Sequence, residues 1–152
     1  MILVRNARLD DAPAMSAVLI ASITQLCVAD HRSDPAVLAA WLANKTPESV
    51  AKWFDNPEST LVVAEHDREI AAVGGFNRAR EITLNYVSPS HRFMGVSSAL
   101  LEALELGLGA GEARLSSTET ARRFYEHRGW KAAGDTATHR GVSGHPMRKM
   151  IG

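Results

Sequence analysis

The stretch from Glu81 to Leu101 constrains the fold of this chain more than any other part of the sequence. Its first residues, EITLNYV, alternate polar and apolar side chains with the period of two that is typical of a strand with two different faces. The Ser88-Pro89-Ser90 segment should end this strand, because proline lacks the N–H group that a sheet ladder needs. After Gly95, apolar residues recur every four positions, which predicts an amphipathic helix that carries Val96, Leu100, Leu104 and Leu108.

A strand, a tight turn and a helix that begins next to Gly95 form a unit suited to binding an anion. The N–H groups of the first helical turn have no partner within the helix, and the helix dipole adds to their attraction for negative charge. A glycine at this place lets the backbone approach a ligand without interference from a side chain. The sequence therefore predicts a phosphate-binding turn between this strand and this helix.

Length and composition narrow the class of protein. The 152 residues are enough for one domain, residues 1–152, whose core needs neither disulfides nor metal. Cys27 is the only cysteine, which excludes an internal disulfide and a cysteine-based zinc site, and we interpret it as a core residue. The formal net charge is zero, so nothing in it favours nucleic acid or an acidic membrane as a partner. With no apolar stretch long enough for a signal peptide or a membrane span, the cytoplasm is the expected location by elimination.

Short signals mark where other elements begin and turn. Asp10-Asp11-Ala12-Pro13 and Thr46-Pro47 both indicate helix starts, because a capping oxygen precedes a proline whose missing N–H costs little there. Asp67-Arg68 indicates a hairpin turn. Gly74-Gly75, inside the return strand, indicates a bulge or a close backbone approach.

The resulting order of elements predicts an α+β fold, in which a mixed α/β arrangement places helices on both faces of one sheet. We expect strands over residues 2–7, 61–64, 70–76, 81–87, 113–117, 130–133 and 147–151. We expect helices over residues 12–26, 36–44, 48–54, 96–108 and 118–128. The polar segments 29–35 and 134–146 are interpreted as loops.

Two segments resemble motifs of the GCN5-related N-acetyltransferases. The segment VSPSHRFMGVS, residues 87–97, is similar to the family's acetyl-CoA motif, (Q/R)-x-x-G-x-(G/A), with Ser97 at the second small position. The segment TETARRFYEHRGW, residues 118–130, is similar to the later motif N-x-x-A-x-x-F-Y-x-x-x-G-F, with Thr118 replacing asparagine and Trp130 replacing phenylalanine. The order of elements matches as well, so the resemblance covers nearly the whole chain. It implies a central, mostly antiparallel sheet that is splayed at the cofactor site.

The resemblance implies acetyl-CoA as cosubstrate and no metal. In this interpretation the backbone amides from Arg92 to Ser97 bind pyrophosphate, and the N–H of Val87 binds the thioester carbonyl. The Arg92 side chain is either a phosphate ligand or a solvated cation. The cofactor-binding residues expected from the resemblance are Val87, Arg92, Phe93, Met94, Gly95, Val96, Ser97, Ser98 and Thr118.

Tyr125 and Glu81 are the candidate catalytic residues. A phenol with a reference pKa of about 10 stays protonated at neutral pH and can donate to a leaving thiolate, so Tyr125 is the candidate general acid. The alternative is an aromatic residue packed beside Phe124; neighbours on a helix point in different directions, so a core Phe124 would leave Tyr125 freer to face a cleft. Glu81 is the candidate base, because its spacing to Arg92 resembles that of the glutamate base in histone-acetylating relatives. The alternative is an exposed glutamate at the start of a strand.

The acceptor site is expected at the loops that follow the first helix and that lie near residues 134–145. In the resembled family the segment after the first helix commonly builds this site, which makes His31 and Asp34 candidates, although such charged residues also suit a solvated loop. Thr83 and Asn85 share a strand face with Glu81 and would line the cleft with it. The expected partner is a small-molecule or peptide amine, with no nucleic acid and no membrane, and the sequence is compatible with a homodimer.

These features together predict an acetyl-CoA-dependent N-acetyltransferase in which a primary amine attacks the thioester directly within a ternary complex. The alternative is a module of the same fold that binds acetyl-CoA as a sensor or a structural ligand without turnover. Thiol release from acetyl-CoA in the presence of amines distinguishes the two.

Overall fold

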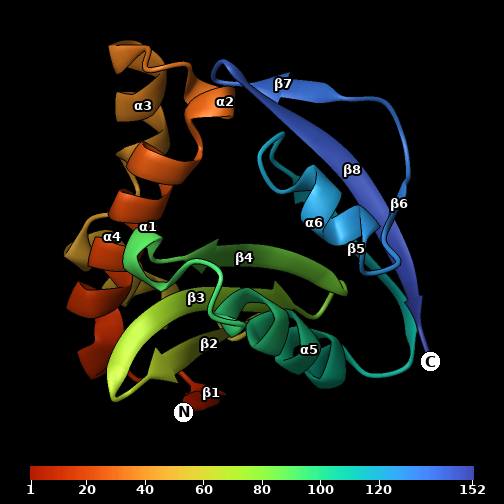
Figure 1. Ribbon diagram of the computed structural model, residues 1–152, viewed down its shortest axis with the longest axis horizontal. Coiled ribbons are helices and arrows are strands. Elements are labelled where there is room, and N and C mark those ends of the chain that lie inside the picture. Colours follow the sequence, from red (N-terminus) through yellow and green to blue (C-terminus); the bar gives the residue numbers. More distant parts are fainter.

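The computed structural model describes residues 1–152, which form a mixed sheet with helices on both faces (Figure 1). The strands are β1 (Ile2–Asn6), β2 (Ser59–His66), β3 (Glu69–Asn77), β4 (Glu81–Val87), β5 (Gly111–Ser117), β6 (Lys131–Ala132), β7 (Ala137–His139) and β8 (Val142–Ile151). The α-helices are α1 (Ala12–Leu26), α2 (Val28–His31), α3 (Pro35–Leu42), α4 (Pro47–Trp53), α5 (Val96–Leu108) and α6 (Arg122–Glu126). Two 3₁₀ turns, Leu9–Asp11 and Pro89–His91, precede α1 and α5.

The sheet is splayed between β4 and β5, as the family resemblance implied. The strand order is β1-β2-β3-β4-β5-β8-β6, with β7 paired to β8 beside this path. Every neighbouring pair is antiparallel except β4 and β5, which are parallel and share only the pairs Glu81↔Arg114 and Ile82↔Leu115. Figure 1 shows the groups β1–β4 and β5–β8 spreading apart beyond that contact. The remainder of β4 therefore has one edge without a strand partner.

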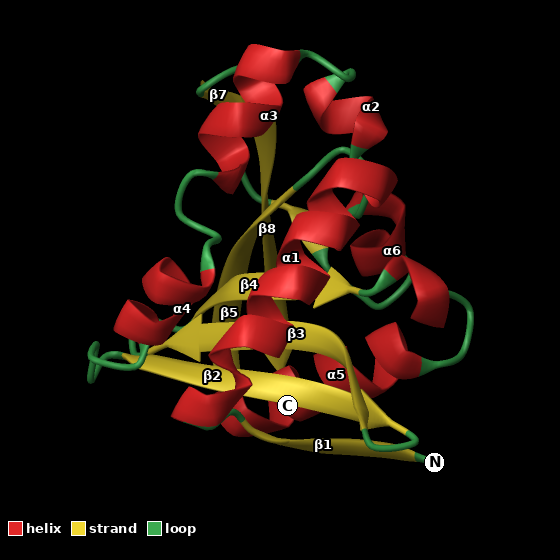
Figure 2. Ribbon diagram, turned by 90° about the vertical axis from the view of Figure 1, so that its left-hand side faces the viewer, coloured by secondary structure: helices red, strands yellow, loops and turns green.

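Two apolar cores lie on the two faces of the sheet and hold the helices there. Helix α5 packs Val96, Leu100, Leu101 and Leu104 against strands β2–β5, in one cluster with Tyr125 and Trp130. Helices α1 and α4 form the other core, which contains Met15, Leu19, Val50 and Val63. Figure 2 shows α1 and α4 in front of the strands, with α5 behind. Burial of these side chains supplies the main favourable term in folding.

A bulge at Thr83 changes the alternation of side chains along β4. Gly75 pairs with Leu84, but the next residue of β3, Phe76, pairs with Ile82, so Thr83 has no partner of its own. As a result Ile82 packs in the core on the α5 side, whereas Leu84 packs in the core on the α1 side. The expectation that Ile82 and Leu84 share one face is therefore wrong.

The paired glycines lie next to a bulge, whose extra residue is on β4, and next to closely packed side chains of α5. The register of β3 and β4 shifts directly after Gly75. A Cβ atom on Gly74 would come within 3.0 Å of a Leu100 methyl group on α5. The missing side chain therefore lets the helix approach the strand closely, which brings the start of α5 near the end of β4.

Three segments differ from the sequence-based prediction. Residues 28–31, interpreted as loop, form the short helix α2, which ends at Arg32 and Ser33 in the left-handed region. Residues 118–121 form a turn rather than the start of a longer α6, because the amides of Glu119 and Thr120 bind the Asp30 carboxylate. Residues 137–146, interpreted as loop, pair as a hairpin of β7 and β8 through backbone contacts that need no apolar pattern.

No helix in the structure is both long enough and apolar enough to cross a membrane. No group of three or more His, Cys, Asp or Glu side chains is arranged to hold a metal ion.

Candidate active site

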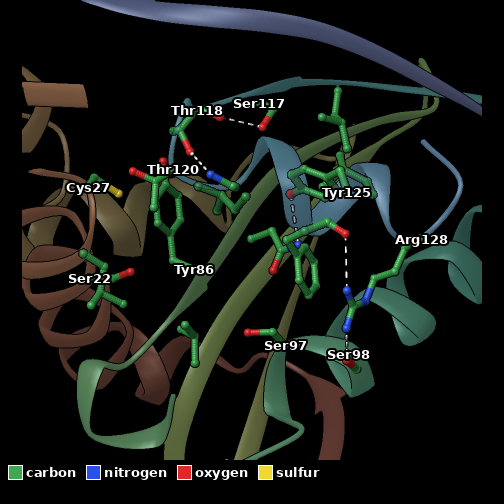
Figure 3. Close-up of a pocket in the computed structure, with 18 of the residues that line it drawn as sticks. Ser22, Cys27, Tyr86, Ser97, Ser98, Ser117, Thr118, Thr120, Tyr125 and Arg128 are labelled. Atoms are coloured by element: carbon green, nitrogen blue, oxygen red, sulfur yellow. Dashed lines mark hydrogen bonds between the residues drawn. The ribbon is translucent and has the colours of Figure 1, made fainter. Parts of the chain in front are cut away.

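A cavity of about 400 Å³ opens where β4 and β5 diverge. Its walls come from β4, the C-terminal end of α1, the start of α5, and the turn between β5 and α6. Figure 3 shows Ser22, Cys27, Tyr86 and Thr120 on one side of this cavity and Tyr125, Arg128, Ser97 and Ser98 on the other. We call the first side the α1 end and the second side the α5 end.

The α5 end carries the predicted phosphate-binding turn. Gly95 is the N-cap of α5 with φ +80°, a conformation that favours glycine, and the first helical bond runs from Ala99 N to Gly95 O. The amides of Val96, Ser97 and Ser98 therefore have no partner within the helix. Gly95, Ser97 and Ser98 line the cavity, whereas the Val96 side chain is 1% exposed and belongs to the core, so only its backbone can face a ligand.

Two arginines give the α5 end a positive charge. The Arg128 guanidinium donates to Ser98 Oγ at 2.6 Å and lies 3.9 Å from the centre of the Phe124 ring. The Arg92 guanidinium lies 4.7 Å from the centre of the exposed Phe93 ring. Both arginines line the cavity, and no Asp, Glu, Lys or His does. This balance suits a ligand that carries phosphate groups.

The unpaired edge of β4 offers a backbone donor to the cavity. The N–H of Ser88 donates to Ala71 O on β3 at 2.7 Å. Because N–H directions alternate along a strand, the N–H of Val87 points away from β3. Val87 lines the cavity and has no partner on β5, so its N–H faces the space where a carbonyl oxygen can bind.

Tyr125 places its hydroxyl between the two ends of the cavity. Its oxygen accepts a hydrogen bond from Asn85 Nδ2 at 3.0 Å, which links α6 to β4 (Figure 3). Burial raises the pKa of Tyr125 to about 12, so the phenol stays protonated at neutral pH. Tyr125 is 5% exposed and packs edge-on against Trp130, while Phe124 is only partly buried. Both rings line the cavity, and Phe124 does not occupy the core position that the sequence analysis considered for it.

The α1 end is lined by uncharged side chains from distant parts of the sequence. Ser22, Leu26 and Cys27 come from α1 and its C-cap, Tyr86 from β4, and Thr120 from the turn before α6. Burial and then the nearby charge of Asp30 raise the pKa of the Cys27 thiol to about 12. Burial also raises the pKa of Tyr86. Both groups are therefore neutral at neutral pH.

The structure brings most of the predicted site residues together. Seven of the nine cofactor candidates line the cavity, together with Thr83, Asn85 and Tyr125; the seven are Val87, Arg92, Phe93, Gly95, Ser97, Ser98 and Thr118. Met94 is half-exposed and is not among the lining residues.

Besides Met94 and Val96, three further predicted residues lie outside the cavity. Glu81 is exposed at the far end of β4, where its carboxylate accepts from Asn77 Nδ2 at 3.3 Å. The buried His31 ring contacts the carbonyls of Ile23 and Thr24, which fixes the corner between α1 and α2. Asp34 is the N-cap of α3 and accepts from two amides of that helix. The structure thus gives His31 and Asp34 local structural contacts and gives Glu81 none with the cavity.

The chain matches the family model described as "Acetyltransferase (GNAT) domain" over residues 22–151. It belongs to the GNAT acetyltransferase family. No curated protein matches the sequence.

Solved structures of GNAT proteins share the fold at low sequence identity. A GCN5-related N-acetyltransferase from Rhodopseudomonas palustris superposes with a TM-score of 0.86 at 22% identity, over 98% of this chain and 95% of that one. The PaiA N-acetyltransferase from Thermoplasma acidophilum, solved in complex with coenzyme A, has a TM-score of 0.80 at 18% identity, over 99% of both chains. The ribosomal-protein-S18-alanine N-acetyltransferase from Escherichia coli has a TM-score of 0.67 at 18% identity, over 99% of this chain and 94% of that one. These similarities show the fold.

Sequence reasoning missed several residues that this GNAT cavity uses. Arg128 stands four positions after Phe124, a spacing at which helical side chains meet, and this signal would have found their contact. Ser22, Leu26 and Tyr86 carry only the pattern of core residues, so nothing local marks them as cavity residues. Asp30 lies in the segment 29–35 that was interpreted as a loop, and no spacing relates it to Thr120, its hydrogen-bond partner beside the cavity.

Proposed function

We propose that this protein is an acetyl-CoA-dependent N-acetyltransferase that transfers an acetyl group to a primary amine by direct attack in a ternary complex. One observation carries the proposal: a single cavity joins the open N-terminus of α5 to the buried, protonated hydroxyl of Tyr125. A phosphate site alone suits many reactions, whereas a phosphate site that shares a cavity with a general acid suits acyl transfer from a thioester.

The α5 end is the proposed cofactor site. The free amides of the first turn of α5 would bind the pyrophosphate, and Arg92 and Arg128 would balance its charge. Its relative from Thermoplasma acidophilum was solved with coenzyme A, which is consistent with this ligand class. Acetyl-CoA, when bound, supplies the acyl thioester.

The N–H of Val87 is the proposed oxyanion donor. Negative charge develops on the carbonyl oxygen as an amine attacks a thioester, and a fixed backbone donor stabilises that charge more than it stabilises the ground state. The splay between β4 and β5 leaves this donor without a strand partner on the cavity side.

Tyr125 is the proposed general acid. Thiols titrate near a pKa of about 8.5, so a thiolate can leave on its own, and proton donation adds roughly 10²-fold to the rate. The hydrogen bond that Asn85 donates to the phenol oxygen fixes the ring and leaves the phenol proton free for another acceptor.

The test is thiol release from acetyl-CoA by the purified protein with a panel of primary amines, beside direct measurement of coenzyme A binding. Amine-dependent thiol release is the expected result. Tight binding of coenzyme A with no turnover on any amine, and no effect of Tyr125→Phe, would instead favour a binding module of the same fold.

A further inference from the structure

A buried carboxylate attaches the turn between β5 and α6 to helix α2. Asp30 is 8% exposed, and its Oδ1 atom accepts a hydrogen bond from Glu119 N at 2.7 Å. Its Oδ2 atom accepts one from Thr120 N at 3.2 Å and another from the Thr120 hydroxyl at 2.5 Å. All three contacts are donors to Asp30, the pattern expected of a carboxylate that serves only as an acceptor.

Thr120 faces this carboxylate and the cavity at the same time. Its side chain lines the α1 end (Figure 3), and its single hydroxyl proton is donated to Asp30. The lone pairs of its Oγ1 atom are therefore the part that can meet a ligand, and an adjacent carboxylate makes them more basic. Thr120 is the place where the charge of Asp30 can act on a molecule in the cavity.

The neighbouring groups cannot accept a proton in its place. The Cys27 thiol and the Tyr86 phenol, which line the same end, are both protonated at neutral pH because burial raises their pKa values. The charge of Asp30 contributes to both shifts, so its field reaches this end of the cavity. The Glu119 carboxylate is directed elsewhere, with its Oε2 atom 2.7 Å from His145 Nε2 on β8 and its Oε1 atom 3.5 Å from Arg122.

We propose that Thr120, polarised by Asp30, accepts the proton of the attacking amine. The inference rests on the proposed acetyl transfer. As the amine nitrogen forms its bond to the carbonyl carbon, the nitrogen becomes acidic; its proton moves to Thr120 Oγ1 while the Thr120 proton moves to Asp30 Oδ2. The carbon–sulfur bond breaks, and the thiolate takes the proton of Tyr125. Solvent then removes the proton from Asp30 and returns one to Tyr125, so the protein ends as it began.

The arrangement separates the two proton transfers in space. Thr120 lies at the α1 end and Tyr125 lies toward the α5 end, so one serves the incoming amine and the other serves the leaving thiolate (Figure 3). Thr120 is the catalytic residue in this scheme, because it would touch the substrate. Asp30 acts through it as a positioning and polarising residue.

Thr120→Val tests the proposal, because valine keeps the shape of threonine and Asp30 keeps its bonds to the two amides. With an amine that the wild type acetylates, we expect kcat to fall roughly 10²-fold while the Kd of coenzyme A changes less than about twofold. Thr120→Ser restores the hydroxyl and should recover most of the rate. The kcat of the valine variant should also rise more steeply with pH than that of the wild type, because hydroxide replaces the lost acceptor.

Three outcomes would overturn the inference. A valine variant with wild-type kcat and an unchanged pH profile would show that the hydroxyl takes no part. If the valine and serine variants lose coenzyme A affinity to the same extent, and thermal stability to the same extent, Thr120 has only a structural role. If the wild type turns over no amine, the proposed acetyl transfer is wrong and this inference fails with it. Activity of the wild type therefore distinguishes that failure from the other two.

Discussion

The two ends of the cavity are built in different ways. The α5 end is built mainly from one stretch of the chain, residues 92–98, to which Arg128 and Tyr125 are added, and most of what this stretch offers a ligand is backbone at a helix N-terminus. The α1 end is made by single side chains from α1, β4 and the turn before α6, which are close only in the folded chain. A contiguous backbone site imposes a local sequence pattern, because turn and helix geometry restrict each position. A site assembled from distant side chains imposes none.

Gly95→Glu should have the largest effect, because it disrupts the proposed phosphate site at the α5 end. The substitution forces a side chain into a backbone with φ +80° and adds negative charge at the phosphate site, so we expect coenzyme A affinity to fall at least about 10²-fold, or ~2.7 kcal/mol. Titration calorimetry with coenzyme A measures it.

The matched control is Gly109→Glu, at the other end of the same helix. Gly109 also has a positive φ, +75°, and open space around its Cα, so it reproduces the backbone strain without the phosphate site. Its ψ of -177° lies in a region that only glycine adopts readily, so this control should lose at least as much stability as Gly95→Glu but keep its affinity for coenzyme A. Equal affinity losses at the two glycines would contradict the phosphate-binding role of Gly95.

Tyr125→Phe should have the next largest effect, and it separates catalysis from cofactor binding. We expect kcat to fall roughly 10²-fold with the Kd of coenzyme A nearly unchanged, because the phenol acts on the leaving thiolate and not on the phosphates. Steady-state kinetics and cofactor titration on the same preparation check it. A selective loss of coenzyme A affinity would mean that Tyr125 holds the cofactor arm instead.

Burial of Tyr125 also predicts how stability depends on pH. Its pKa is raised to about 12 in the folded protein, above the reference value of about 10, so the neutral phenol is favoured by folding. This contribution, of order 2–3 kcal/mol, is present below pH ~10 and is lost as pH rises through ~12. The free energy of unfolding in urea should decline between pH 8 and pH 11, and the decline should be smaller in Tyr125→Phe than in the wild type. Identical declines in the two proteins would mean that another group, such as Tyr86, causes the effect.

Arg128→Gln should have a moderate effect at the α5 end. Loss of one cation beside the phosphate site should weaken coenzyme A binding about 3- to 10-fold, and less at high salt. Arg123→Gln is the matched control, because Arg123 is an exposed arginine on α6, the helix just before Arg128, and does not line the cavity. An effect of equal size for Arg123→Gln would mean that the loss of affinity comes from the change in net charge and not from the position of Arg128.

The difference between the two ends explains how far the sequence could be interpreted. The strand over residues 81–87, the helix over residues 96–108 and the place of Gly95 at the start of that helix were predicted correctly, because each follows from the local pattern of residues 81–101. The splay of the sheet came from the family resemblance and is confirmed. The bulge at Thr83 was not placed, since a one-residue shift in register depends on the partner strand. The contact of Asp30 with Thr120 joins segments ninety positions apart, and no local rule predicts it.

Glu81→Gln should have the smallest effect. It tests whether the amine proton is accepted at the α1 end or outside the cavity. The family resemblance made Glu81 a candidate base, but its side chain is exposed, contacts Asn77 and does not line the cavity. We expect kcat to change less than about twofold, whereas Thr120→Val should reduce it roughly 10²-fold under the same conditions. A large fall in kcat for Glu81→Gln at unchanged coenzyme A affinity would mean that a water chain carries the amine proton along β4. Glu81 would then be the general base, as the family resemblance suggested, and Thr120 would only line the cavity.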